Sequence, residues 1–292
     1  MTTSFVRNLP PDRHVVIAGP TASGKSALAL RIAQTQGGTV VNADALQVWS
    51  CWQILTARPD ATDLAQAPHA LYGHVAPGCH YSAGEWLSEV SRISGRLIVV
   101  GGTGLYLNAL TRGLAEIPPT PAEIRAAGDA MMRMPQGLAR MVAQLDPATR
   151  ARIDLNNSAR VQRAWEVLQT TGKGIVTWQQ HTPPPLIDSA RACMVVLESD
   201  RDWLATRIER RFHRMMDQGA LDEVRANLPR WDQGALWARA IGASELVEHL
   251  QGRISLETAI DRAIAATRQY AKAQRTFFRG RMRDWPRLRV DA

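Results

Sequence analysis

The chain has 292 residues, of which 45% are hydrophobic and 21% are charged, as in ordinary globular proteins. No apolar run approaches the roughly 20 residues of a membrane-spanning helix, and the N-terminus lacks the apolar core of a secretory signal. Three scattered cysteines (Cys51, Cys79 and Cys193) suit a reducing cytosol and argue against a structural zinc site. The net charge of +8, carried mostly by arginine, favours a polyanionic partner in the cytoplasm.

The first motif along the chain is a phosphate-binding loop. An apolar, strand-like run ends at Ala18, and the next eight residues fit the pattern G-x-x-x-x-G-K-[ST] before a helical periodicity begins. Backbone amides of such a loop, together with the positive end of the helix, hold a phosphate chain. Lys25 is expected to reach the terminal phosphate and Ser26 to bind Mg²⁺. The predicted phosphate-binding residues are Gly19, Pro20, Thr21, Ala22, Ser23, Gly24, Lys25 and Ser26.

Further apolar runs predict a parallel sheet. The runs at 14–18, 38–43, 97–101 and 193–198 are separated by helical patterns, which is typical of an α/β fold. Ligands of such sheets bind at the carboxyl ends of the strands. We therefore expect the phosphate loop, Asp44 and Thr103 to share one crevice.

Two residues of that crevice are candidates for chemistry. Asp44 could bind Mg²⁺ through water or act as a general base, and Thr103 could donate a hydrogen bond to a phosphate oxygen. Caps of a helix or turn are the structural alternative for both residues. The run at 97–101 continues into Gly-Gly-Thr-Gly and not into an Asp, which argues against an ATP-hydrolysing motor. These residues are also compatible with a small-molecule kinase.

The strand pattern disappears between about residues 114 and 188, and proline-rich sequences bound this segment. Thr120 to Glu123 resemble a capping box, Asp146 precedes a proline at a helix start, and Asn157 or Ser158 caps a third helix. The predicted organisation is a first part of the core at 1–113, a helical insertion domain at 114–188, and completion of the core with basic helices at 189–292.

Arginines recur at helical spacing in two segments. Arg207, Arg211 and Arg214 share one face of a predicted helix, opposite an apolar side. A second stripe consists of Arg268, Lys272, Arg275 and Arg279, with Tyr270, Phe277, Phe278 and Trp285 interleaved. A solvated face is the simpler explanation of one stripe, but the density near the C-terminus favours contact with nucleic-acid phosphates.

Motifs in order along the chain point to one family. They are GPTASGKSALAL, VNADALQVWSCWQILTARP, YSAGEW, GGTGLYLNAL, DPATRARIDLNNSARVQRAWEVLQTTGK, RRFHRMMDQGALDEV, AIGASEL and TRQYAKAQRTFFRG. Together they resemble the bacterial tRNA dimethylallyltransferases over nearly the whole chain. The resemblance implies a P-loop NTPase-like parallel sheet flanked by helices, with the insertion acting as a tRNA clamp.

The resemblance also implies a reaction: transfer of a dimethylallyl group from its diphosphate to N6 of the adenosine next to the tRNA anticodon, releasing diphosphate. Asp44 would accept the proton of the amine, while Thr103, Lys25 and Arg211 would neutralise the diphosphate held by the loop. Mg²⁺ with Ser26 as ligand is the implied cofactor, and the implied partners are tRNA and dimethylallyl diphosphate. The residues implied to bind tRNA are Asp44, Ala45, Leu46, Gln47, Thr103, Arg125, Ser158, Ala159, Arg160, Val161, Gln162, Arg163, Lys272, Arg275 and Arg279.

Some positions depart from the pattern of the family. Ala45, Trp49 and Arg58 replace a usual Ser, Tyr and Lys, Ala243 stands where Tyr is common, and Ala273 interrupts Ala-Lys-Arg-Gln. These changes concern contacts with the substrate more than the reaction. A nucleotide-binding kinase, a transferase acting on free AMP or ADP, and a non-enzymatic RNA-binding protein are the alternatives. A cytoplasmic monomer is expected.

Overall fold

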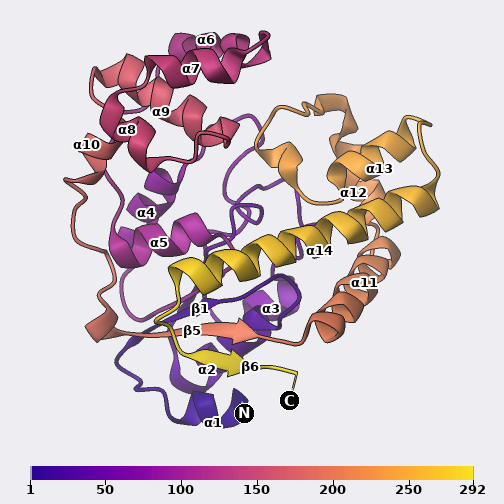
Figure 1. Cartoon of the computed structure of the whole chain (residues 1–292). Coiled ribbons are helices and arrows are strands. Elements are labelled where there is room, and N and C mark those ends of the chain that lie inside the picture. Colours follow the sequence, from indigo (N-terminus) through magenta and orange to yellow (C-terminus); the bar gives the residue numbers. More distant parts are fainter. Residues whose placement is uncertain (1, 292) are drawn as a thin grey trace. The chain divides into compact units, whose positions relative to one another are not determined.

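The computed structural model describes residues 2–291 and divides the chain into two compact units. One unit contains the chain up to Thr111 and again from Leu186 onward, and the other is Arg112–Pro185 (Figure 1). The second unit thus starts and ends slightly before the expected 114–188. No helix of residues 2–291 is both long and apolar enough to cross a membrane.

Six parallel strands form the sheet of the first unit, in the order β3-β2-β4-β1-β5-β6. β1 lies in the centre, with Val15 opposite Ile98 of β4 and Cys193 of β5. The bounds are β1 (His14–Ala18), β2 (Thr39–Asn42), β3 (His69–Ala70), β4 (Leu97–Gly101), β5 (Ala192–Glu198) and β6 (Arg287–Arg289). The four expected strands are confirmed, whereas β3 and β6 are too short to leave an apolar pattern in the sequence.

The four longer strands, β1, β2, β4 and β5, contribute side chains to two separate hydrophobic cores, because successive residues of a strand point to opposite faces. Val15 and Ile17 of β1 pack in one core with Leu28 and Ile32 of α2, while Val16 packs on the other face. Burial on both faces explains why the strands are continuous apolar runs without alternation. The arrangement, with a phosphate-loop motif directly after the central strand, is that of P-loop NTPase-like folds.

The helices of the first unit lie on both faces of this sheet (Figure 1). Short 3-10 turns at Ser189–Arg191, Leu228–Arg230 and Trp237–Arg239 connect some of them. The helices are α1 (Thr2–Arg7), α2 (Lys25–Gln36), α3 (Ala61–Gln66), α4 (Ala83–Ser91), α5 (Gly104–Arg112), α11 (Arg201–Asp217), α12 (Ala220–Asn227), α13 (Ala243–Leu250) and α14 (Leu256–Arg281).

The second unit is helical and has its own core of Met141, Leu145, Val161, Ala164 and Trp165. Its helices are α6 (Ala122–Arg133), α7 (Gly137–Gln144), α8 (Pro147–Arg152), α9 (Ser158–Thr171) and α10 (Ile175–Gln179).

The predicted helix starts of this unit are only partly correct. Asp146 caps α8 and Asn157 caps α9, as expected. The predicted capping box at Thr120 is wrong, because the residue preceding α6 is Pro121 and no side chain caps that helix. The hydroxyl of Thr120 instead accepts a hydrogen bond of 2.5 Å from Arg163.

Candidate active site

A cavity opens beside the phosphate loop in the first unit. It brings together charged residues from three segments that are distant in sequence, namely the phosphate loop, the loop after β2, and α11. Its lining includes Thr21, Ala22, Lys25, Ser26, Asp44, Leu46, Gln47, Arg211 and Tyr270. The expected proximity of Asp44 and Arg211 to the phosphate loop is therefore found.

The phosphate loop leaves the first turn of α2 open. Gly24 precedes the helix with φ of 90°, a left-handed conformation that glycine adopts at little cost, and no side chain caps the helix. Ala22, also in the loop, has φ of 62°. Uncapped amides and the positive helix end make this loop a site for an anion.

Lys25 is the first residue of α2 and is only 9% exposed. Among residues 2–291, its Nζ donates one hydrogen bond, 3.3 Å long, to the backbone oxygen of Pro20. Burial lowers the pKa of Lys25 to about 8, with the charge of Asp44 acting in the opposite direction and that of Arg211 lowering it further. A buried ammonium with so little compensation favours the binding of an anion beside it.

Arg211 adds a second cation to the same cavity. It forms no hydrogen bond or ion pair with another residue of the described chain, 2–291. Burial lowers the pKa of Arg211, and the negative charge of Asp44 opposes this effect. Arginine binds phosphate bidentately, so its free guanidinium complements the loop amides and Lys25.

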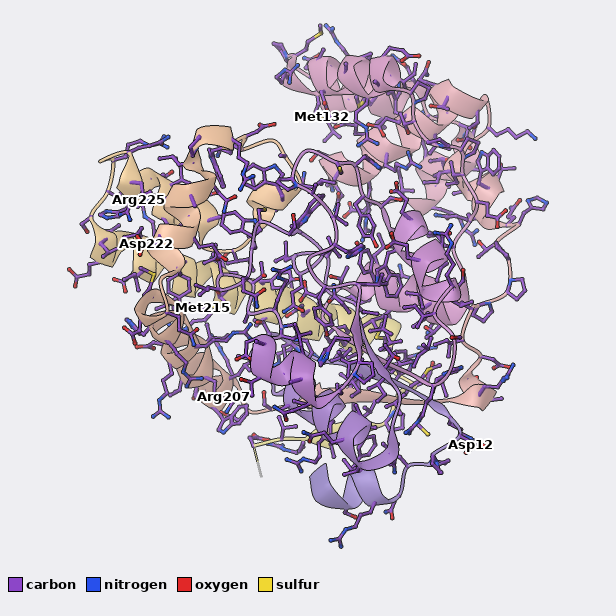
Figure 2. All side chains as sticks on the ribbon, turned by 180° about the vertical axis from the view of Figure 1, so that it is seen from behind. Asp12, Met132, Arg207, Met215, Asp222 and Arg225 are labelled. Atoms are coloured by element: carbon purple, nitrogen blue, oxygen red, sulfur yellow. The ribbon has the colours of Figure 1, made fainter. Side chains whose placement is uncertain are left out.

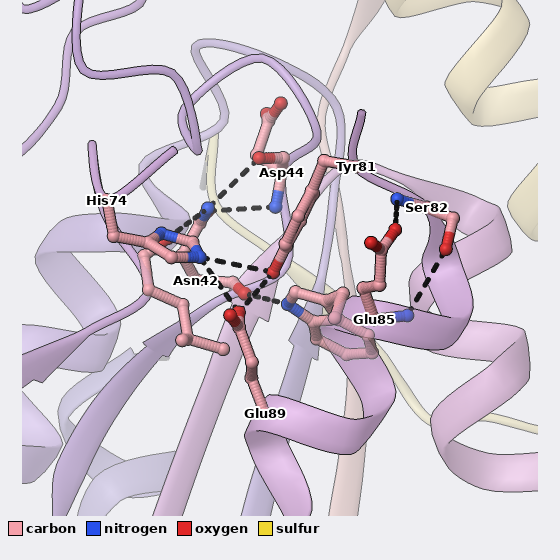
Figure 3. Close-up of polar contacts among 9 residues, drawn as sticks. Asn42, Asp44, His74, Tyr81, Ser82, Glu85 and Glu89 are labelled. Atoms are coloured by element: carbon pink, nitrogen blue, oxygen red, sulfur yellow. Dashed lines mark hydrogen bonds and ion pairs between the residues drawn. The ribbon is translucent and has the colours of Figure 1, made fainter. Parts of the chain in front are cut away.

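The backbone around Asp44 is held by a buried asparagine (Figure 3). Asn42 has no exposed surface; its Oδ1 accepts from the N–H of Asp44 at 2.8 Å, and its Nδ2 donates to the carbonyl of the same residue at 3.0 Å. One carboxylate oxygen of Asp44 accepts from the N–H of Leu46 at 3.0 Å. The carboxylate therefore keeps accepting capacity toward the cavity while its backbone is fixed.

A second polar cluster lies next to this loop (Figure 3). The carboxylate of Glu89 accepts from Tyr81 at 2.5 Å and contacts Nε2 of His74 at 2.8 Å. Burial, followed by the hydrogen bond to Glu89, raises the pKa of Tyr81. His74 is thus engaged in a hydrogen-bonded cluster behind the site.

Thr103 lies behind the loop of Asp44 and is not among the residues that line the cavity. Its Oγ1 accepts from the N–H of Ala45 at 2.8 Å, and its own N–H donates to the carbonyl of Ala43 at 3.1 Å. The structure therefore places Thr103 where it supports the loop of Asp44. Ala45 takes part through its backbone, so this contact does not need the usual serine side chain.

An apolar wall completes the cavity, and sequence reasoning missed it. Leu55, Ile208, Phe212, Met215 and Ile241 contribute to this wall. Ile208, Phe212 and Met215 lie on the apolar side of α11, which carries Arg207 and Met215 in Figure 2. The sequence shows the helical spacing of these apolar residues. Apolar side chains that line a ligand cavity and those that pack in a core have the same spacing, so the wall could not be predicted.

The basic stripes differ in how far they are available to a partner. Arg207 donates to the backbone oxygen of Ala22 at 2.9 Å and stacks on Trp203, and Arg268 pairs with Glu209 at 2.8 Å. The other residues of the second stripe, Lys272, Arg275 and Arg279, have no such partner within 2–291. The aromatic residues interleaved with the second stripe in the sequence do not accompany it on an exposed face, because Phe278 and Trp285 are buried and Tyr270 lines the cavity.

The second unit carries the other residues predicted to contact tRNA. Ser158, Ala159 and Arg160 are exposed at the start of α9, and Arg125 is exposed on α6. The others there are less available: Gln162 donates to Asp129 and Glu166, and Arg163 pairs with Glu166 at 3.7 Å.

One of these predictions needs correction. Val161 is fully buried in the core of the second unit, and its N–H is used within α9, donating to Asn157. Its side chain therefore cannot contact RNA.

Comparison with known families fits this geometry. A family model described as IPP transferase matches residues 47–281, and one described as isopentenyl transferase matches residues 13–69. The chain belongs to the IPP transferase family. The tRNA dimethylallyltransferase of Paracoccus denitrificans is 70% identical over 289 residues, which cover 96% of each chain. That of Dinoroseobacter shibae is 62% identical over 282 residues, covering 95% of each chain.

Solved structures of IPP transferases have the same fold. The tRNA isopentenylpyrophosphate transferase of Bacillus halodurans superposes with a TM-score of 0.67 and 30% identity, covering 96% of this chain and 90% of that one. A eukaryotic dimethylallyltransferase described as acting on tRNA superposes with a TM-score of 0.79 and 25% identity, covering 95% and 74%. Two departures of this IPP transferase from the usual pattern, Trp49 and Ala243, are buried in the core.

Proposed function

We propose that this enzyme transfers the dimethylallyl group of dimethylallyl diphosphate to N6 of the adenosine next to the anticodon of tRNA. The observation that carries the proposal is the composition of the cavity. The buried Lys25, the partly buried Arg211 and an uncapped helix start meet in this lining, both cations being poorly compensated, and Asp44 lies on another segment of the same lining. An apolar wall that includes Phe212 and Met215 suits the hydrocarbon part of the donor.

The reaction is a substitution at an allylic carbon. The lone pair of N6 attacks C1 of the dimethylallyl group, the bond between C1 and oxygen breaks, and diphosphate leaves with the bonding electron pair. Asp44 takes the proton that the amine loses. Lys25, Arg211 and the loop amides neutralise the negative charge that grows on the departing diphosphate.

The residues present also fit Mg²⁺. The hydroxyl of Ser26 lines the cavity and has no hydrogen-bond partner among the described residues, and Asp44 lines the same space. Mg²⁺ prefers oxygen ligands and usually binds through one or two protein groups together with substrate phosphates and water. Ser26 would hold the ion against the diphosphate, where the ion supplies further positive charge to the leaving group.

Recognition of tRNA would use basic groups of both units that are exposed or partly exposed. Lys272, Arg275 and Arg279 of α14 are free to bind backbone phosphates, as is Arg160 of α9. The target base must leave its stack to reach Asp44 and Gln47, as in other base-modifying enzymes. The enzyme would act as a monomer in the cytoplasm.

The test is a transfer assay with radiolabelled dimethylallyl diphosphate and unmodified tRNA, followed by nucleoside analysis. Asp44→Asn should transfer at least about 100-fold more slowly than the unchanged enzyme while its affinity for tRNA is retained, as expected for loss of a general base. Asp12→Asn, a change at an exposed carboxylate (Figure 2), is the matched control.

Near-normal transfer by Asp44→Asn would overturn the assigned role. Consumption of ATP without the allylic donor would indicate a kinase. If free AMP were prenylated as efficiently as tRNA, the enzyme would be a transferase that acts on free nucleotides.

A further inference from the structure

One buried side chain of α14 joins the two loops at the edge of the cavity. Gln274 is 5% exposed; its Oε1 accepts from the N–H of Thr21 at 2.8 Å, and its Nε2 donates to the carbonyl of Gly102 at 3.0 Å. Thr21 belongs to the phosphate loop, and Gly102 precedes Thr103. A single amide group therefore fixes the separation of two loops that come from different strands.

The connection continues from Gly102 to the loop of Asp44, and Tyr270 lies one turn before Gln274 on α14. Tyr270 lines the cavity, and burial and then the charge of Asp44 raise its pKa. Thr103 in turn accepts from the N–H of Ala45, next to Asp44. The phosphate loop and the loop of the proposed base are thus linked through Gln274, the carbonyl of Gly102 and the side chain of Thr103.

The local geometry requires an amide at this position. The two hydrogen bonds need one acceptor and one donor on the same group, and glutamine supplies both. A carboxylate would keep the bond to Thr21 but would place an oxygen against the carbonyl oxygen of Gly102. The approach is also close, because a Cβ built on Gly102 would lie 2.0 Å from Nε2 of Gln274.

We propose that Gln274 is a positioning residue that sets the distance between the diphosphate-binding loop and the loop of Asp44. The inference rests on the proposed function, in which the leaving diphosphate and the attacking amine must lie in line across the allylic carbon. Gln274 is absent from the cavity lining and acts through its hydrogen bonds to Thr21 and to Gly102, the residue before Thr103. A displacement of about 1 Å between the reacting groups can cost on the order of 100-fold in rate.

The first test is kinetic. Gln274→Met keeps the size of the side chain and removes both hydrogen bonds, and Gln269→Met on an exposed position of α14 is the control. We expect the single-turnover rate of transfer per active site to fall by about 10- to 100-fold in Gln274→Met, with the Kd for tRNA unchanged. In combination with Thr103→Val the loss should be smaller than the product of the two single losses, because both changes break one connection.

A purely structural role predicts another result. If Gln274 only stabilised the fold, Gln274→Met would lower the thermal midpoint and the fraction of active enzyme but leave the rate per active site unchanged. The losses of activity in the double variant would then multiply. Either an unchanged rate per active site or multiplicative losses would overturn the proposal.

The second test does not depend on activity. Hydrogen exchange followed by mass spectrometry should speed up in both 19–24 and 101–104 of Gln274→Met, and in neither segment of Gln269→Met. Unchanged exchange in either segment would overturn the proposed link. Failure of the proposed function is distinguishable, since it would appear as absence of tRNA prenylation by the unchanged enzyme.

Discussion

Replacing Lys25 by methionine should abolish diphosphate binding and yet stabilise the ligand-free protein. The folded structure lowers the pKa of this lysine from 10.5 to about 8. Each pH unit corresponds to about 1.4 kcal/mol, so holding the ammonium in the fold costs about 3 kcal/mol when both states are protonated. Methionine has a similar length and no charge, and it should recover much of this free energy.

The effect has a defined pH dependence. The lysine enzyme carries the full cost below pH 8, where Lys25 is protonated in both the folded and the unfolded state. Between about pH 8 and 10.5 the unfolded chain binds a proton that the folded state has released, so the stability of the lysine enzyme rises relative to the variant. The gap between them should therefore close over this range.

Urea unfolding of the ligand-free proteins at neutral and alkaline pH measures this gap. The control is Lys173→Met, which removes an exposed lysine from the second unit and should change little at either pH. Added dimethylallyl diphosphate should stabilise the lysine enzyme and leave Lys25→Met unaffected. A variant no more stable than the lysine enzyme at neutral pH, or a gap independent of pH, would refute the reasoning.

Two further predictions concern packing and RNA binding. Gly101→Ala should destabilise the first unit by at least about 2 kcal/mol, because the added Cβ would lie 2.0 Å from the carbonyl oxygen of Ala43; Gly280→Ala, with open space around it, is the control for thermal unfolding. Arg279→Ala should weaken tRNA binding and reduce the slope of log K against log salt by about one, whereas Arg283→Ala, already paired with Asp284, should do so less. An unchanged slope for Arg279→Ala would show that this stripe is a solvated face that does not contact RNA phosphates.

Local sequence was sufficient to predict the features whose residues lie close together along the chain. The phosphate loop is one segment between a strand and a helix, so its amides, Lys25 and Ser26 could all be predicted from spacing alone. The same holds for the caps at Asp146 and Asn157, because a cap is a contact over three residues. The capping box at Thr120 failed because the hydroxyl was used by Arg163, a residue far along the chain.

Predictions for α14 show where the pattern of a helix becomes ambiguous. Its arginine and aromatic positions interleave in the sequence, yet Phe278 is buried and Tyr270 lines the cavity. Thr267, Tyr270 and Gln274 follow helical spacing and could have been grouped. Periodicity shows which residues share a helix face, but it does not show which other element that face packs against. The contact of this group with the phosphate loop could therefore not be predicted.

The sequence by itself determined the phosphate loop, the parallel sheet, the helical insertion and the family motifs, because each depends on short-range spacing or on burial of whole strands. Only the tertiary structure decided that Thr103 supports the loop of Asp44, that Val161 is core, and that Gln274 connects two loops. These roles arise from contacts between segments separated by many residues, where the same side chain can serve a core, a ligand or a neighbouring loop. Which of the three it serves depends on the packing of α14 and the strands around the cavity.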